Sequence, residues 1–168
     1  MQRRTLLKLG LTASAVLLVA GGAATLVQPG MRQGVLSASG RLVFSAVSSA
    51  VLDKTLPDEP AARQAALDGL LGRIDVLVSA LPSHAQDELS QLLSLLATTP
   101  GRLALAGLSP SWPEASVAEI QSALQGMRLS SLALRQQAYA ALHDITAGAY
   151  FSEPSSWALL GYPGPITI

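Results

Sequence analysis

The 168-residue chain contains no cysteine and few charged or aromatic residues. The missing cysteine excludes disulfides, iron–sulfur clusters, thiolate zinc sites and covalent haem attachment. Charged residues make up 13% of the chain, whereas an average globular domain has about 25%. Such a low charge is expected when a partner covers part of the surface, and it is also expected in an alanine-rich composition. Both explanations fit the sequence.

Basic residues do not cluster with aromatic ones anywhere in the chain. Nucleic-acid binding therefore has no electrostatic signature here. No Gly-x-Gly-x-x-Gly pattern follows a predicted strand, so the chain is not expected to bind a dinucleotide by itself. We accordingly predict no nucleic-acid partner and no cofactor held by this chain.

The N-terminus carries two adjacent arginines before an apolar run, Leu9–Val27. This arrangement is typical of signals read by the bacterial twin-arginine translocase, which exports proteins already folded in the cytoplasm. The predicted signal residues are Arg3, Arg4, Leu6, Leu7 and Lys8. We therefore expect a periplasmic protein that folds, alone or with a partner, before export.

The alternative for this segment is an ordinary signal peptide or a retained inner-membrane anchor. The run Leu9–Val27 has 19 residues, close to the roughly 20 that span a bilayer. Many of them are alanine or glycine, which weakens insertion. Ala20-Gly21-Gly22 and Gly22-Ala23-Ala24 fit a small-x-small cleavage site only loosely. Membrane contact is expected only through residues 9–27.

The rest of the chain predicts an all-α fold, an antiparallel bundle of about five or six helices. We divide the chain into a signal or anchor at 1–28, a helical domain at 29–150 and a C-terminal tail at 151–168. With the three basic signal residues removed, eight basic and eleven acidic residues remain, a net charge of −3. A region of this length suits one domain.

Apolar residues recur at helical spacing in five successive segments. The expected helices cover residues 38–56, 60–81, 83 onward, 111 onward and 130–150, with a short piece at 103–108. Ser83 with Gln86, and Ser111 with Glu114, are interpreted as capping boxes. The expected inward residues include Leu42, Val43, Val47, Leu67, Leu70, Leu71, Ile74, Leu77, Val78, Leu89, Leu93, Ile120, Met127, Leu132 and Leu142.

The tail and the residue before it, residues 150–162, gather four of the seven aromatic residues of the chain, with prolines and glycines nearby. This composition predicts an extended and turned segment without a helix. Aromatic residues on such a strip pack either on the domain itself, as a strap, or on another protein, as an arm. The physical arguments favour the strap slightly.

Residues capable of catalysis are few. His84, followed by Asp87 and Glu88, offers too few ligands for a stable metal site. His143 and Asp144 are adjacent, but no Gly-x-Ser-x-Gly motif accompanies them. Asp53, Asp58 and Glu59 flank a proline turn and are expected to face solvent. We predict no catalytic residue and no metal ligand in this chain.

Two regions of the sequence carry a resemblance to a known family. The first is a predicted helix that ends in Leu56-Pro57-Asp58, and the second is the tail, with Tyr150-Phe151 and Pro154 followed by Trp157 and Leu160-Gly161-Tyr162-Pro163-Gly164. Together with the twin arginines, this order resembles the small, third subunit of membrane-associated gluconate 2-dehydrogenase and its relatives. Only Ser155-Ser156 separate Pro154 from Trp157, a shorter spacer than is common there.

The resemblance implies a non-catalytic accessory subunit of a flavoprotein dehydrogenase of the glucose–methanol–choline type. FAD and catalysis would reside in the large partner subunit, which this chain would escort through export, and a cytochrome subunit is a further candidate partner. The implied partner interface comprises Tyr150, Phe151, Trp157, Tyr162 and Pro163. The alternatives are a self-contained periplasmic ligand-binding protein or enzyme, and a membrane-anchored helical scaffold.

Overall fold

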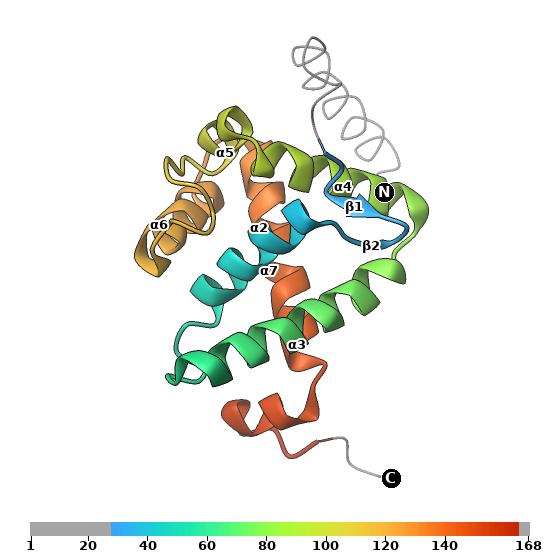
Figure 1. Cartoon of the computed structure of the whole chain (residues 1–168), viewed down its shortest axis with the longest axis vertical. Helices are drawn as coiled ribbons and strands as arrows, with labels where there is room; N and C mark the ends of the chain where they lie inside the picture. Colours follow the sequence, from blue (N-terminus) through green and yellow to red (C-terminus); the bar gives the residue numbers. More distant parts are fainter. Residues whose placement is uncertain (1–27, 165–168) are drawn as a thin grey trace, which may run out of the picture.

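The structure, a computed structural model, describes residues 28–164. Six α-helices form a bundle, with a small hairpin before them and a short 3₁₀ helix after them (Figure 1). The elements are β1 (Met31–Arg32), β2 (Val35–Leu36), α2 (Ala38–Val51), α3 (Pro60–Ser79), α4 (Ser83–Ala97), α5 (Thr99–Leu105), α6 (Val117–Arg128), α7 (Ala133–Phe151) and η1 (Pro154–Leu160). The prediction of an all-α bundle is confirmed. No helix among the described residues is long and apolar enough to cross a membrane.

Helix α2 lies at the centre of the bundle and packs against α3, α4, α6 and α7 (Figure 1). Val43, Phe44 and Val47 are fully buried. The Ser37 side chain caps the helix by accepting a hydrogen bond from the Gly40 backbone N–H. Leu42 was expected inside but is 51% exposed, because the neighbouring helices cover the other flank of α2.

Helix α3 begins as predicted with Pro60 in its first turn, where a missing N–H costs no hydrogen bond. Its predicted apolar stripe is confirmed for the residues that pack toward the core, and Leu77 is only half-buried. The fully covered positions face α2 and α7. The buried residues are Leu67, Leu70, Leu71, Ile74 and Val78.

Truncating the centre of this stripe gives a stability prediction. Ile74 has no exposed surface, so Ile74→Ala should cost about 2–5 kcal/mol of unfolding free energy through lost burial and a cavity. Val76, two residues along the same helix, is 72% exposed, and Val76→Ala should change stability by less than about 0.5 kcal/mol. Urea unfolding of both variants measures the contrast. Equal effects would show that α3 does not pack by this face.

The N-terminal hairpin was not predicted, because each strand has only two residues. Met31 pairs with Leu36 and Arg32 with Val35. Gln33 and Gly34 both have positive φ, 53° and 80°, as two-residue hairpin turns of the I′ type require. The signal that could have revealed this turn is the Gln-Gly pair between short apolar flanks.

Helix α4 begins at Ser83 as predicted, but the capping box predicted there was wrong. Pro82, not Ser83, is the N-cap of α4, and Gln86 donates hydrogen bonds backward to the Ser79 and Leu81 carbonyls. The short helical piece expected at residues 103–108 lies earlier in the chain, as α5, because Thr98 caps that helix by accepting a hydrogen bond from the Gly101 N–H. Serine and threonine occur both in helix caps and in turns, which is why the sequence alone did not identify the caps of α4 and α5.

The capping box of the fourth predicted helix also lies elsewhere. Ser111 and Glu114 are hydrogen-bonded, but they close a single turn. Helix α6 begins five residues later with a complete capping box between Ser116 and Glu119. The two Ser-x-x-Glu motifs are close in sequence, and only the second is followed by sustained burial, from Ile120 onward. The first helix was likewise extended too far, since α2 ends at Val51 and not at residue 56.

Candidate functional site

The two sequence regions that carry the family resemblance meet at one open pocket. The pocket has a volume of about 350 Å³. One wall is the loop between α2 and α3 with the exposed side of α3, and the other is the end of α7 with the start of η1. Its lining residues are Thr55, Leu56, Pro57, Ala65, Ala66, Gly69, Arg73, Tyr150, Glu153, Ser155 and Ser156. Residues nearly one hundred positions apart thus share one surface.

Arg73 joins the two walls of the pocket. Its Nε donates a 3.0 Å hydrogen bond to the Ala149 carbonyl in the last turn of α7. Its Nη1 lies 3.8 Å from Glu153 Oε2, just before η1. A cation at the end of a helix satisfies carbonyls that have no partner within the helix. Arg73 therefore links α3 both to the end of α7 and to the residue that precedes η1.

The tail contains a helix, which corrects the prediction of an extended segment. Pro154 occupies the first turn of η1, where its fixed φ suits a helix. Gly161 ends η1 with a φ of 65°, the left-handed conformation that glycine adopts without a steric penalty. Prolines and glycines were read as helix breakers, but here they start and stop one short helix.

The predicted interface residues fall into two aromatic pairs. Tyr150 and Phe151 stand edge to face at the end of α7, with ring centroids 5.2 Å apart. Trp157 and Tyr162 form a second edge-to-face pair at 5.4 Å. Tyr150 lines the pocket, whereas Phe151, Trp157, Tyr162 and Pro163 do not. The structure therefore places one of the five at the pocket and the other four on adjoining parts of the C-terminal segment.

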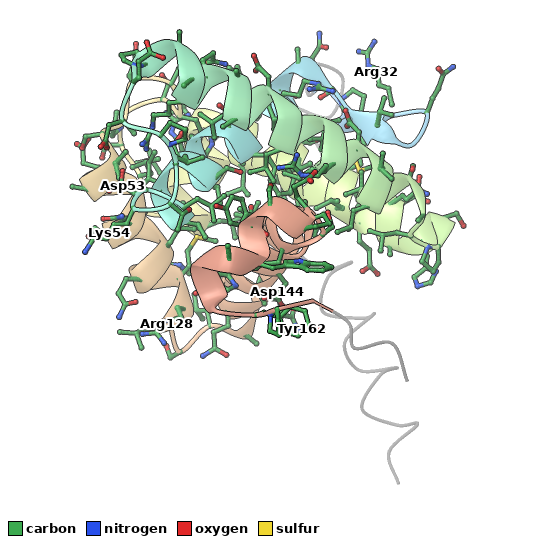
Figure 2. The ribbon with its side chains drawn as sticks, turned by 90° about the horizontal axis from the view of Figure 1, so that it is seen from below. Arg32, Asp53, Lys54, Arg128, Asp144 and Tyr162 are labelled. Atoms are coloured by element: carbon green, nitrogen blue, oxygen red, sulfur yellow. The ribbon has the colours of Figure 1, made fainter. Side chains whose placement is uncertain are left out.

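Trp157 organises the end of the described chain. Its Nε1 donates a 2.7 Å hydrogen bond to the Phe151 carbonyl, and Gly164 lies against its ring. Tyr162 remains 49% exposed at the edge of the segment that follows η1 (Figure 2). The segment is thus folded on itself, with one aromatic residue turned partly inward and one turned outward.

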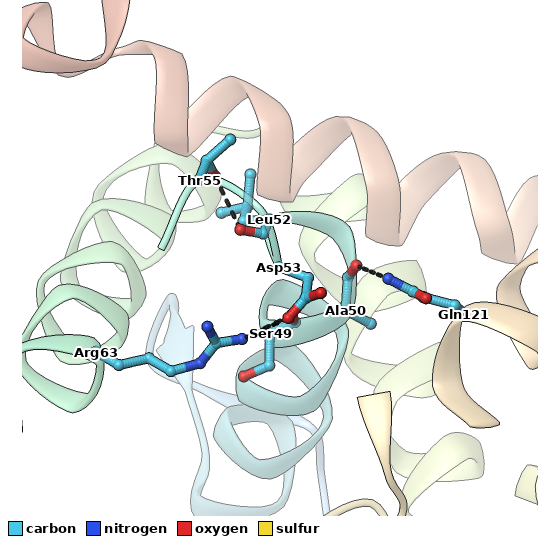
Figure 3. A network of polar contacts seen from close by, with 7 residues as sticks. All are labelled: Ser49, Ala50, Leu52, Asp53, Thr55, Arg63 and Gln121. Atoms are coloured by element: carbon cyan, nitrogen blue, oxygen red, sulfur yellow. Dashed lines mark hydrogen bonds and ion pairs between the residues drawn. The ribbon is translucent and has the colours of Figure 1, made fainter. Parts of the chain in front are cut away.

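A polar network holds the α2–α3 loop beside the pocket (Figure 3). Arg63 Nη2 binds Asp53 Oδ1 at 3.0 Å and the Ser49 carbonyl at 3.3 Å. Gln121 of α6 donates to the Ala50 carbonyl at 3.0 Å. Asp53, which was expected to face solvent freely, is therefore partly covered and paired. These contacts position Thr55 to Pro57, which form the pocket wall.

Glu59 is the N-cap of α3, a role that the sequence reading missed. Its carboxylate accepts hydrogen bonds from the Ala61 and Ala62 backbone N–H groups. These bonds lower the pKa of Glu59 below its usual value of 4.5. Glutamate is a less common cap than serine, threonine or aspartate, which is why its signal was weak.

The lowered pKa predicts a pH dependence of stability. Because the folded-state pKa lies below the unfolded one, Glu59 stabilises the fold at neutral pH, and this stabilisation is lost as the pH falls below 4.5 through the lowered value. Glu59→Gln should therefore be less stable than the parent at pH 7, with the difference shrinking toward pH 3. Urea midpoints of both proteins at each pH measure this, and a constant difference would contradict it.

Neither histidine lines the pocket. His84 is exposed near the start of α4. His143 Nδ1 lies 3.0 Å from Asp144 Oδ1, and its ring stacks on Tyr139. Among residues 28–164, no three His, Asp or Glu side chains gather in a way that could hold a metal ion. The export-signal residues Arg3, Arg4, Leu6, Leu7 and Lys8 lie outside the described residues.

Comparison with protein-family models, with curated proteins and with solved structures finds no match to this chain.

Proposed function

We propose that this chain is a non-catalytic accessory subunit that escorts an FAD-dependent dehydrogenase of the glucose–methanol–choline type through twin-arginine export and stabilises it. FAD and the reacting groups would belong to the partner, and the complex would work in the periplasm. The proposal rests on the resemblance, on the twin arginines and on the geometry of the pocket.

The observation that carries the proposal is the meeting of the two resembling regions. Leu56 and Pro57 from the α2–α3 loop line the same pocket as Tyr150 from the end of α7. Segments so distant in sequence are brought together by the fold, and together they form an open surface. Residues gathered on one surface can form a protein-binding site, whereas the same residues spread over the molecule could not.

Co-expression tests the proposal directly. The full chain, carrying an affinity tag at its C-terminus, is produced together with an FAD-dependent dehydrogenase of the glucose–methanol–choline type from the same organism. We expect the two proteins to purify together with bound FAD, and the dehydrogenase to lose solubility when this chain is omitted. A dehydrogenase that is soluble, active and exported without this chain would refute the proposal.

Two glycines on α3 offer a matched pair of variants for the docking surface. Gly69 lines the pocket, whereas a Cβ at Gly72 would meet no heavy atom within 4 Å. Gly69→Phe should fill the pocket and weaken co-purification at least tenfold. Gly72→Phe, on the same helix and also exposed, should leave it unchanged. Equal affinities would place the partner elsewhere on the chain.

The pocket volume also supports the alternative of a periplasmic ligand-binding protein. Small-molecule sites occupy about 300–1,000 Å³, and this pocket lies at the lower end at about 350 Å³. Arg73 and Glu153 would supply its polar contacts. The same two glycine variants separate the two functions. If the chain is a ligand-binding protein, the Gly69→Phe variant should remain soluble and monomeric, and no co-purifying partner should be lost.

A further inference from the structure

The side chain of Arg73 reaches back along α3 into the pocket, as long side chains on helices do. Its Nη1 lies 3.7 Å from the position that a Cβ at Gly69, about one helical turn earlier, would take. Glycine at position 69 therefore leaves room for the guanidinium group over the helix. The Arg73 side chain is 31% exposed, so the guanidinium group is accessible to a group that enters the pocket.

The hydrogen-bond donors of Arg73 are only partly used. Among residues 28–164, its one hydrogen bond runs from Nε to the Ala149 carbonyl. The 3.8 Å between Nη1 and Glu153 Oε2 is longer than a hydrogen bond. The Glu153 side chain is 46% exposed, and ion pairs in such surroundings are weak. Nη1 and Nη2 are therefore left without a strong acceptor.

The rest of the pocket is mostly small or apolar. Among the described residues that line it, Arg73 and Glu153 are the charged ones, while Tyr150 and Ser155 add hydroxyl groups. The small and apolar lining residues are Leu56, Pro57, Ala65, Ala66 and Gly69. The pocket thus offers strong hydrogen-bond donors next to apolar walls.

A carboxylate is the group that matches these donors. A guanidinium group presents parallel N–H groups that bind both oxygens of a carboxylate, and such paired bonds are stronger than a single contact. Glu153 makes only one long contact with Arg73. A doubly charged phosphate suits the pocket less well, because a single arginine faces it and Glu153 would repel it.

The position and residue types of the pocket favour a carboxylate carried by a protein. The pocket lies at the end of the molecule that carries η1, at the bottom of Figure 1. Arginine and tyrosine are among the residues that contribute most to binding energy at protein interfaces, and Arg73 and Tyr150 both line this pocket. Apolar atoms beside the carboxylate would lie against Leu56 and Pro57.

We propose that the partner inserts an aspartate or glutamate side chain into this pocket, and that Arg73 exchanges its long contact with Glu153 for paired hydrogen bonds to that carboxylate. This role of Arg73 rests on the proposed function, because it names the chemical group by which the escorted protein is held. Glu153 then acts in the free chain as a competitor that is displaced on binding.

Dissociation of the complex tests this exchange. The tagged full chain with its bound FAD-dependent dehydrogenase is immobilised, and loss of FAD fluorescence gives the dissociation rate. Arg73→Gln should dissociate at least tenfold faster, since an interface anchor is lost. Glu153→Gln should dissociate about threefold more slowly, because the competing carboxylate is removed. Arg128→Gln, at an exposed arginine of α6 outside the pocket, should not change the rate.

The opposite directions of the two effects distinguish exchange from a structural ion pair. If the pair only held the fold together, loss of either member would weaken the complex or neither would. Rates equal to the parental one in both variants, or faster dissociation of Glu153→Gln, would overturn the proposal and leave the escort function intact. A parental chain that retains no dehydrogenase would refute both.

A carbodiimide cross-link identifies the carboxylate itself. The chain has two lysines, Lys8 and Lys54, so Arg73→Lys adds an amine that mass spectrometry can recognise. Carbodiimide activates a nearby carboxylate, which then forms an amide with the amine at position 73. We expect a link from this position to an aspartate or glutamate of the dehydrogenase. Gly72→Lys, exposed beside the pocket but not lining it, should give no such link. A link from position 73 to Glu153 alone, or no link, would overturn the proposal.

Discussion

Replacing Arg3 and Arg4 with lysine is expected to abolish export of this chain. The receptor of the twin-arginine route reads the guanidinium pair, and lysine conserves the charge but not the planar, fork-shaped set of donors. Fractionation of cells that express the Arg3→Lys/Arg4→Lys variant, with detection in cytoplasm and periplasm, measures the effect. We expect the periplasmic signal to disappear and the cytoplasmic one to persist.

The same variant tests the escort function. A dehydrogenase partner that has no export signal of its own should remain in the cytoplasm together with the variant chain. Lys8→Arg, which alters the signal without touching the pair, serves as the control and should be exported normally. Periplasmic accumulation of the double-lysine chain at the parental level would refute the twin-arginine interpretation, and export of the partner alone would refute the escort.

The helical core could be predicted from sequence because its signals are periodic. In α3, Leu70, Leu71 and Ile74 recur at the spacing of one helical face and are all buried. Pro60 marked the start of this helix correctly. Leu42 and Leu132 satisfied the same pattern but are exposed, since periodicity identifies an apolar face without showing whether a neighbour covers it.

Other features depend on contacts between distant residues and had no local signal. Gly30, just before the hairpin, donates a hydrogen bond to the Ser94 hydroxyl of α4, and Asp75 accepts a 2.8 Å hydrogen bond from the Leu36 N–H of the hairpin. Asp75 also pairs with Arg41. The pocket likewise lies between segments far apart in sequence, and Arg73 of α3 links them by a hydrogen bond to the Ala149 carbonyl at the end of α7. Short elements fixed by long-range hydrogen bonds are invisible to a reading based on periodicity and caps.

The candidate site was found in part by its motifs. The tail aromatics and the Leu-Pro-Asp turn were singled out from sequence, and the structure places Leu56, Pro57 and Tyr150 around one pocket. Arg73 and Glu153, which connect the pocket walls, were not predicted as site residues. A lone arginine on the polar side of a helix has no sequence feature that distinguishes a structural role from simple solvation.

The second large effect is expected at Trp157. Its ring contacts Tyr162 and Gly164, and its Nε1 binds the Phe151 carbonyl, so it holds together the segment that follows α7. If this segment grips the flavoprotein, Trp157→Ala should weaken the complex by about 2 kcal/mol or more, which corresponds to roughly a 30-fold higher Kd. Titration of the purified partner with each chain measures the change.

Trp112 provides the contrast, because it is the other tryptophan and belongs to the core. It is 3% exposed, and its Nε1 binds the Leu96 carbonyl at 2.8 Å. Trp112→Ala should cost about 3–5 kcal/mol of unfolding free energy. Trp157→Ala should leave the helical content and the urea midpoint of the isolated chain nearly unchanged, since η1 has its main contacts with α7 alone. A Trp157→Ala chain that unfolds as readily as Trp112→Ala but binds its partner with unaltered Kd would identify the segment as an internal strap. The partner interface would then have to be sought at the pocket wall formed by α3.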